Sequence, residues 1–247
     1  MRKAIVTAAD TSHALSVARL VKLCKEQMPE FKVYVFDLGL TEADLVGIDK
    51  KAIIIKYDYA KYPAFHNINI NAGEYAWKPI CIHEIAKRSE NLTNIDLLFW
   101  IDAGCLIKNG LKEEIEIAKK WGIYTSLTKG TLGEYTDPRT LNLMGVPDGL
   151  RTFRMRAASF LGFDLIHPLV EDFIFEWAWL ATHKNIFAPD GSSKHPKIKG
   201  DTNPQYNHRQ DQSVFTALLT RYGFDVVGKR WNFKIQQDID NRPKNIK

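Results

Sequence analysis

Apolar runs of strand length alternate with segments of helical periodicity along the first hundred residues. We expect strands at 3–9, 32–38, 52–59 and 96–102. Helices are expected at 12–27 and 73–90, the latter from about Lys78, with Pro79 tolerated in its first turn. Continuous apolar strands separated by helices are typical of a parallel sheet covered by helices on both faces. The pattern therefore predicts an α/β fold.

The second half of the chain has a less regular pattern. We expect helices at 111–121, 167–184 and 211–223, and strands at 122–128, 154–165 and 224–228. Residues 129–150, rich in Gly, Thr, Pro and Asp, are expected to be irregular. Residues 185–207 are expected to form a long polar loop, and loops of that length in a compact domain are usually functional or mobile.

Composition narrows the function classes. The 247 residues are 45% hydrophobic and 26% charged, which is ordinary for a globular protein. The net charge of +5 suits an anionic ligand, but the basic residues are scattered and show no nucleic-acid-binding motif. No apolar run approaches the ~18 residues of a membrane span. Three widely spaced cysteines and a start without a secretory signal favour a cytoplasmic protein, with no transmembrane segment and no nucleic-acid partner.

The stretch "LLFWIDAGC", residues 97–105, draws attention to its aspartate. In open α/β sheets, ligands bind beyond the carboxyl ends of the strands, and Asp102 follows a buried strand there. Ala103 and Gly104 would let a ligand approach the backbone closely. The alternative is that Asp102 only caps a turn.

Three further stretches join this one in a recognisable order: "YAWKP" (75–79), "AASFLGF" (157–163) and "HRQDQSVFTALL" (208–219). Together they resemble the GT-A-fold nucleotide-sugar-dependent glycosyltransferases, of the glycogenin-like and galactosyltransferase-like superfamily, over roughly residues 3–228. The resemblance implies a single GT-A-like α/β domain, 1–247, with a mostly parallel, Rossmann-like sheet flanked by helices. Residues 1–110 would be its nucleotide-binding half, 111–230 its acceptor and sugar half, and 231–247 a polar tail.

The implied reaction moves a sugar from a nucleoside-diphosphate sugar to a hydroxyl of a glycan or glycolipid acceptor. Asp102 would hold the sugar donor, and Asp211 would act at the sugar or as general base. For Asp211 the alternative is a helix N-cap. The residues expected to contact the sugar donor are Thr7, Asp10, Lys78, Ala103, Gly104, Arg156, His208, Arg209 and Gln212.

The metal site departs from the family pattern. The family carries Asp-x-Asp and binds Mn²⁺ or Mg²⁺ there, whereas this chain has Asp-Ala-Gly, with Gly104 in place of the second carboxylate. Either a further ligand joins Asp102, with His208, Asp211 and Asp201 as candidates, or the cation is dispensable. In the second case cationic side chains would replace it. The candidates are Lys78, Arg151, Arg154, Arg156 and Arg209.

Three other functions compete with glycosyl transfer. A degenerate domain would bind a nucleotide sugar without transferring it. A basic nucleic-acid-binding domain is disfavoured by the mixed charge pattern. A dinucleotide-dependent oxidoreductase is weaker still, because "VTAADTSHA" after the first strand lacks the G-x-G-x-x-G fingerprint.

Overall fold

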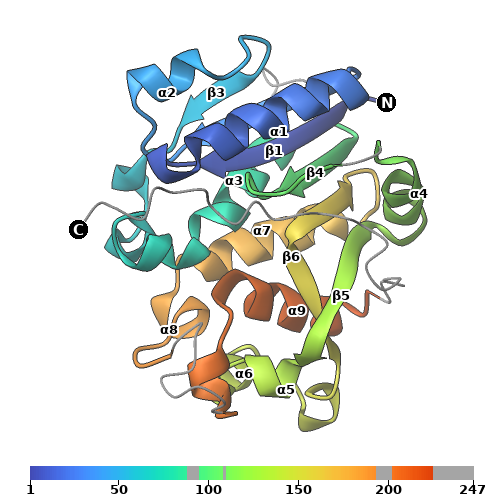
Figure 1. Ribbon diagram of the computed structural model, residues 1–247. Helices are drawn as coiled ribbons and strands as arrows, with labels where there is room; N and C mark the ends of the chain where they lie inside the picture. Colours follow the sequence, from blue (N-terminus) through green and yellow to red (C-terminus); the bar gives the residue numbers. More distant parts are fainter. Residues whose placement is uncertain (88–94, 108–109, 193–201, 225–247) are drawn as a thin grey trace.

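A six-stranded sheet organises the computed structural model, which describes residues 1–87, 95–107, 110–192 and 202–224 (Figure 1). The strand order is β3-β2-β1-β4-β6-β5. The strands are β1 (Lys3–Ala9), β2 (Phe31–Asp37), β3 (Ile53–Lys56), β4 (Leu97–Ile101), β5 (Ile123–Thr131) and β6 (Arg154–Asp164). The first four run parallel, whereas β6 is antiparallel to both β4 and β5. The predicted α/β class with a mostly parallel sheet is confirmed.

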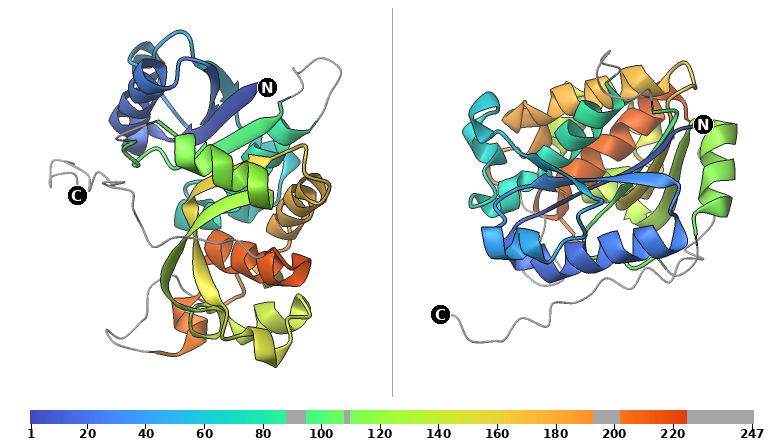
Figure 2. Two further views of the ribbon diagram at one scale, coloured as in Figure 1. Left: turned by 90° about the vertical axis from the view of Figure 1, so that its right-hand side faces the viewer. Right: turned by 90° about the horizontal axis from the view of Figure 1, so that it is seen from above.

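Helices cover both faces of this sheet, as Figure 2 shows from above. The helices of the described residues are α1 (Ala14–Gln27), α2 (Glu42–Val46), α3 (Trp77–Ala86), α4 (Lys112–Trp121), α5 (Leu132–Tyr135), α6 (Pro138–Leu143), α7 (Val170–Ala181), α8 (Lys184–Phe187) and α9 (Gln210–Tyr222). Helices α1 and α4 pack on one face, and α3, α7 and α9 lie on the other.

Strand β4 lies at the centre of both hydrophobic cores. All five of its side chains are fully buried. Leu97, Phe99 and Ile101 point into the core under α1 and α4, and Leu98 and Trp100 into the core under α3, α7 and α9. Burial on both faces explains why this strand is continuously apolar rather than alternating.

Several expected elements differ from those observed. The segment 129–150, expected to be irregular, holds the end of β5 together with α5 and α6. The expected loop 185–207 begins within α8 and ends in a 3-10 turn over Pro204–Asn207. The short α2 was missed, although Thr41 and Asp44 form a capping box at its start. The strand expected at 224–228 falls almost wholly outside the described residues, as does the tail 231–247.

The topology places an aspartate at the carboxyl end of each of three parallel strands, along the same edge of the sheet. Asp10, Asp37 and Asp102 stand at or just after the carboxyl ends of β1, β2 and β4. Strand β6 continues past the end of β4, where the Asp102 N–H donates to the Ser159 carbonyl at 2.9 Å. Within the described part of the chain, no helix combines the length and the apolar character needed to cross a membrane.

Candidate active site

Asp102 presents a carboxylate at the end of β4 that is held by a neighbouring ring. Its Oδ1 accepts a hydrogen bond from Trp100 Nε1 at 2.6 Å, and 32% of the side chain remains exposed. A Cβ added at Gly104 would meet no atom within 4 Å, so open space lies beside this position. The hydrogen bonds found for the Asp102 carboxylate go to side chains, which favours a site role over the turn-capping alternative.

Lys78 joins Asp102 to the start of α9. Its Nζ lies 3.0 Å from Asp102 Oδ1 and 2.6 Å from Asp211 Oδ2, and it donates to the Ala158 carbonyl at 3.1 Å. The residue is only 2% exposed. Burial alone would lower the pKa of Lys78, but the two carboxylate charges and their hydrogen bonds raise it above its ordinary value. Lys78 is therefore a charged, buried ammonium whose three protons all have acceptors.

Asp211 lies in the first turn of α9, but it is not the N-cap. The N-cap position belongs to Arg209, whose N–H donates to Ser213 Oγ at 2.9 Å. The Asp211 side chain is 6% exposed and directs its carboxylate to Lys78. The N-cap alternative for Asp211 is therefore wrong: an ion pair with another element fixes this carboxylate.

A left-handed segment precedes α3 and contacts the start of α9. Every residue from 71 to 75 has a positive φ, which is rare outside glycine. A Cβ at Gly73 would lie 2.4 Å from the His66 carbonyl oxygen, so only glycine fits there. Glu74 accepts a hydrogen bond from Gln210 Nε2 at 3.0 Å, and Gln210 itself has a φ of 35°. Backbone strain of this kind persists where the surrounding contacts enforce it, and it is concentrated at functional sites.

Sequence reasoning missed Glu74 and Gln210. Gln210 lies within the quoted stretch "HRQDQSVFTALL", next to Asp211, and Glu74 directly precedes "YAWKP". The isolated Gly73 before the helix was the available signal. Two neighbouring residues of α9 thus bind two residues of the 74–78 segment.

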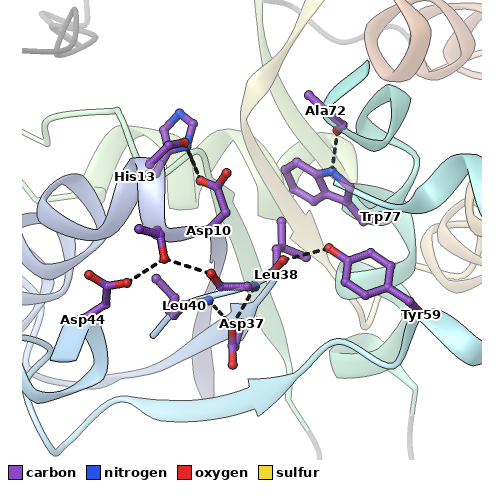
Figure 3. Close-up of polar contacts among 12 residues, drawn as sticks. Asp10, His13, Asp37, Leu38, Leu40, Asp44, Tyr59, Ala72 and Trp77 are labelled. Atoms are coloured by element: carbon purple, nitrogen blue, oxygen red, sulfur yellow. Dashed lines mark hydrogen bonds and ion pairs between the residues drawn. The ribbon is translucent and has the colours of Figure 1, made fainter. Parts of the chain in front are cut away.

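The end of β1 forms the other side of this edge (Figure 3). Asp10 Oδ1 accepts from Ser12 Oγ at 2.6 Å and lies 2.7 Å from His13 Nδ1. Burial opposes ionisation, but the bonds from His13 and Ser12 prevail and lower the pKa of Asp10 to about 2. Asp10 thus presents an anionic group. Thr7 lies three residues before Asp10, inside β1, and is fully buried.

The remaining walls are fixed by backbone contacts, also visible in Figure 3. Trp77 Nε1 donates to the Ala72 carbonyl at 3.0 Å, and the Tyr59 hydroxyl donates to the Leu38 carbonyl at 2.9 Å. Asp37 accepts from the N–H groups of residues 39 and 40. These bonds hold the loops after β2 and β3 and the start of α3 in place.

His208 is fully buried, and its ring bonds to backbone groups of other segments. Its Nδ1 accepts from the Asp137 N–H at 3.1 Å and its Nε2 donates to the Phe187 carbonyl at 2.9 Å. Burial lowers the pKa of His208 to about 4, so the ring is neutral at pH 7. Both ring nitrogens are engaged, so ligation of a metal would require breaking one of these bonds.

The other predicted residues lie around the central cluster. Gln212 Nε2 donates to Thr128 Oγ1 at 2.9 Å. The Arg209 guanidinium lies 4.3 Å from the centre of the Tyr135 ring, and that of Arg156 lies 5.3 Å from the Phe153 ring. The structure brings together Asp102, Lys78 and Asp211, whereas these arginines stack on aromatic rings.

The donor set for a divalent cation is thin. Across the described ranges, no group of three His, Cys, Asp or Glu residues could hold a metal ion. Asp201, proposed as an additional ligand, lies outside the described residues. The residues present therefore do not fit the metal site that the sequence resemblance implies.

Comparisons with known proteins place the fold. No family model matches the chain, and no curated protein matches it by sequence. Solved structures, in contrast, match the chain over most of its length. Core-mannan synthase A (CmsA/Ktr4) from Aspergillus fumigatus, in a Mn/GDP form, has a TM-score of 0.50 and 8% identity, covering 89% of this chain and 69% of its own. The bifunctional glycosyltransferase WbbM has a TM-score of 0.50 and 11% identity, covering 87% of this chain and 36% of its own.

The galactosyltransferase LgtC, solved with donor and acceptor sugar analogues, has a TM-score of 0.49 and 18% identity, over 87% of this chain and 70% of its own. Identities this low compare folds rather than activities. This chain has the GT-A-like α/β fold of nucleotide-sugar glycosyltransferases.

Proposed function

We propose that this protein is a glycosyltransferase that moves a sugar from a nucleoside-diphosphate sugar to a hydroxyl of a glycan or glycolipid. The observation that carries the proposal is the Asp102–Lys78–Asp211 cluster. Three segments that are remote in sequence meet there, at the carboxyl edge of the parallel strands, where open α/β sheets bind ligands.

The two halves of the chain would divide the work. Residues 1–110 would bind the nucleotide, with Asp10 at the end of β1 as a hydrogen-bond acceptor for base or ribose. Residues 111–230 would bind the sugar and the acceptor. Thr7 would contribute to the nucleotide side only after a local rearrangement, since it is fully buried.

Asp102 and Asp211 would act on the sugar donor directly. Asp102 keeps about a third of its side chain open to solvent and would hold the donor at the strand tip. Asp211 would accept hydrogen bonds from sugar hydroxyls, or take the proton of the acceptor hydroxyl as general base. Gln212, one residue on, would add a side-chain amide next to the same position.

The leaving diphosphate needs positive charge around it. Arg156 and Arg209 would supply it through bidentate contacts to phosphate oxygens. The Mn/GDP form of CmsA/Ktr4 is consistent with divalent-cation and nucleotide use in this fold. Because this chain has Gly104 where the family has a second carboxylate, the proposed roles fall on side chains of the protein.

A degenerate binding module is the second candidate, favoured by the same Gly104. Such a domain would bind a nucleotide sugar without turning it over. Release of nucleoside diphosphate from a bound nucleotide sugar separates the two functions.

The test is a thermal-shift panel of nucleoside diphosphates and their sugars on the full chain. A ligand at ~100 times its Kd stabilises the folded state by about 2.7 kcal/mol, which is readily measured. We expect one nucleoside diphosphate and its sugars to raise the Tm. We also expect the protein to release the nucleoside diphosphate from those nucleotide sugars. A flat panel contradicts the proposal.

A further inference from the structure

The two carboxylates of the cluster already share a cation. Lys78 Nζ lies 2.6 Å from Asp211 Oδ2 and 3.0 Å from Asp102 Oδ1, with the Ala158 carbonyl as its third oxygen partner at 3.1 Å. An ammonium surrounded by three protein oxygens is bound much as a metal ion would be. It therefore performs part of the charge compensation that a divalent cation performs elsewhere.

We propose that Lys78 is a built-in cation that replaces the divalent metal, so that nucleoside-diphosphate binding and sugar transfer by this chain need neither Mn²⁺ nor Mg²⁺. This inference rests on the proposed function and concerns the same site. Of the two alternatives, a further metal ligand or a dispensable cation, it chooses the dispensable cation.

The described residues around Asp102 offer few oxygen ligands to a divalent cation. Asp102 Oδ1 is shared between Trp100 Nε1 and Lys78 Nζ, and Gly104 offers no carboxylate. His208 uses both of its ring nitrogens on backbone groups. A magnesium or manganese ion prefers six ligands, and the described residues leave it little beyond one oxygen of Asp102.

A metal ion cannot share the position between the two carboxylates with Lys78. A cation placed between Asp102 and Asp211 would have to displace the Lys78 ammonium. Lys78 is only 2% exposed, so solvent cannot replace its lost partners. A buried charge deprived of its partners is strongly destabilising. Mutual repulsion between a divalent ion and an ammonium a few ångströms away would add to that cost.

A diphosphate also needs positive charge from the protein. Two carboxylates alone would repel a diphosphate, and Lys78 neutralises one of them. Arg156 and Arg209 stand two residues before Ala158 and Asp211, respectively, and their guanidinium groups, which now lie against the Phe153 and Tyr135 rings, would turn to the phosphates when a diphosphate binds. Guanidinium groups bind phosphate oxygens bidentately and remain charged at all relevant pH values. The protein itself thus carries the positive charge that the leaving group requires.

The primary test is calorimetric titration of the full chain with UDP, GDP, ADP and CDP, in EDTA and then in excess Mn²⁺. We expect the Kd of the diphosphate that binds to differ by no more than about twofold between the two conditions. Binding only in the presence of Mn²⁺ overturns the inference and leaves the proposed function intact. Absence of binding in both conditions overturns the proposed function, and the inference with it.

Two variants test the cause. Gly104→Asp restores a second carboxylate in open space, and we expect its affinity for the diphosphate to become Mn²⁺-dependent by about tenfold or more. Gly149→Asp is the matched control, since it adds the same charge at an exposed glycine that is equally free of neighbours. If Gly104→Asp responds to Mn²⁺ no more than Gly149→Asp does, residue 104 is not the determinant and that part of the inference fails.

Lys78→Ala vacates the cation position directly. We expect Mn²⁺ alone to raise the Tm of this variant, while the Tm of the wild type and of Lys3→Ala, which removes a surface ion-paired lysine, stays unchanged. Stabilisation of the wild type by Mn²⁺ to the same extent would overturn the proposal. Should Lys78→Ala not fold, the wild-type titration in EDTA still decides the question.

Discussion

Replacing Lys78 with methionine should destabilise the fold more than the same replacement of any surface lysine. Methionine keeps the length of the side chain and removes its charge. Asp211 would then be a carboxylate with 6% exposure and no cation, and Asp102, at 32% exposure, would lose one of two partners. Breaking a buried ion pair by removing one partner costs about 3–5 kcal/mol. Most of this should come from Asp211, because water screens Asp102.

The assay is urea denaturation at pH 7, followed by circular dichroism. The double variant Lys78→Met/Asp211→Asn should recover at least about 1 kcal/mol relative to the single variant, because the uncompensated charge is gone. Lys3→Met, which breaks an exposed pair with Glu30, should lie within about 1 kcal/mol of the wild type.

The pH dependence supplies a second check. The folded-state pKa of Lys78 is raised, so its stabilisation is fully present below its unfolded pKa of about 10.4 and is lost only as the pH rises through the folded value. Lys78 therefore stays charged in the wild type between pH 6 and pH 9, and the loss in Lys78→Met should be largest at pH 9 and shrink toward pH 6, where protonation can relieve the uncompensated carboxylate. A loss below about 1 kcal/mol, or a double variant no more stable than the single one, would refute the reasoning.

Three further predictions concern other parts of the site. Burial lowers the folded-state pKa of His66 and His208 to about 4. For each histidine, the free energy of unfolding should therefore be highest above pH 6.5 and fall by roughly 3 kcal/mol between pH 6.5 and pH 4, which the urea midpoint measured against pH would show. Gly73→Ala should cost about 2–3 kcal/mol or more in the same assay, because its Cβ would lie 2.4 Å from the His66 carbonyl oxygen and 2.8 Å from Trp77 Cδ1, at a φ of +64°; a neutral effect would show that the left-handed turn is not enforced. Asp102→Asn should fold normally and lower sugar-donor turnover by roughly 10²-fold or more, and a normal rate of nucleoside-diphosphate release would remove Asp102 from the site.

The sequence predicts the fold class well because the signal is local. Strand β4 is apolar throughout, and the structure buries it on both faces as that pattern requires. Burial on both faces also explains why the sequence did not predict the direction of β6. A strand buried on both faces reads alike whether it runs parallel or antiparallel, so only the three-dimensional packing determines it.

The sequence pointed to the residues of the candidate site one by one, but not to their arrangement. Asp102, Lys78 and Asp211 each followed from a local motif, yet their ion pairs join positions 24 and 133 residues away from the lysine. The left-handed turn before α3 contains one glycine among five positive-φ residues, which is too little sequence signal to predict it. For His208, the residue letter could not reveal that backbone groups already occupy both ring nitrogens.

The most direct test of the account is to incubate the full chain with nucleotide sugars in EDTA and measure the release of nucleoside diphosphate. The panel should cover UDP-, GDP-, ADP- and CDP-sugars, with Asp211→Asn as the paired variant. The account predicts release from one nucleotide series by the wild type, and a loss of roughly 10²–10⁴-fold in Asp211→Asn at saturating sugar donor. Equal rates in the two proteins, or no release from any nucleotide sugar even after Mn²⁺ is added, would contradict it.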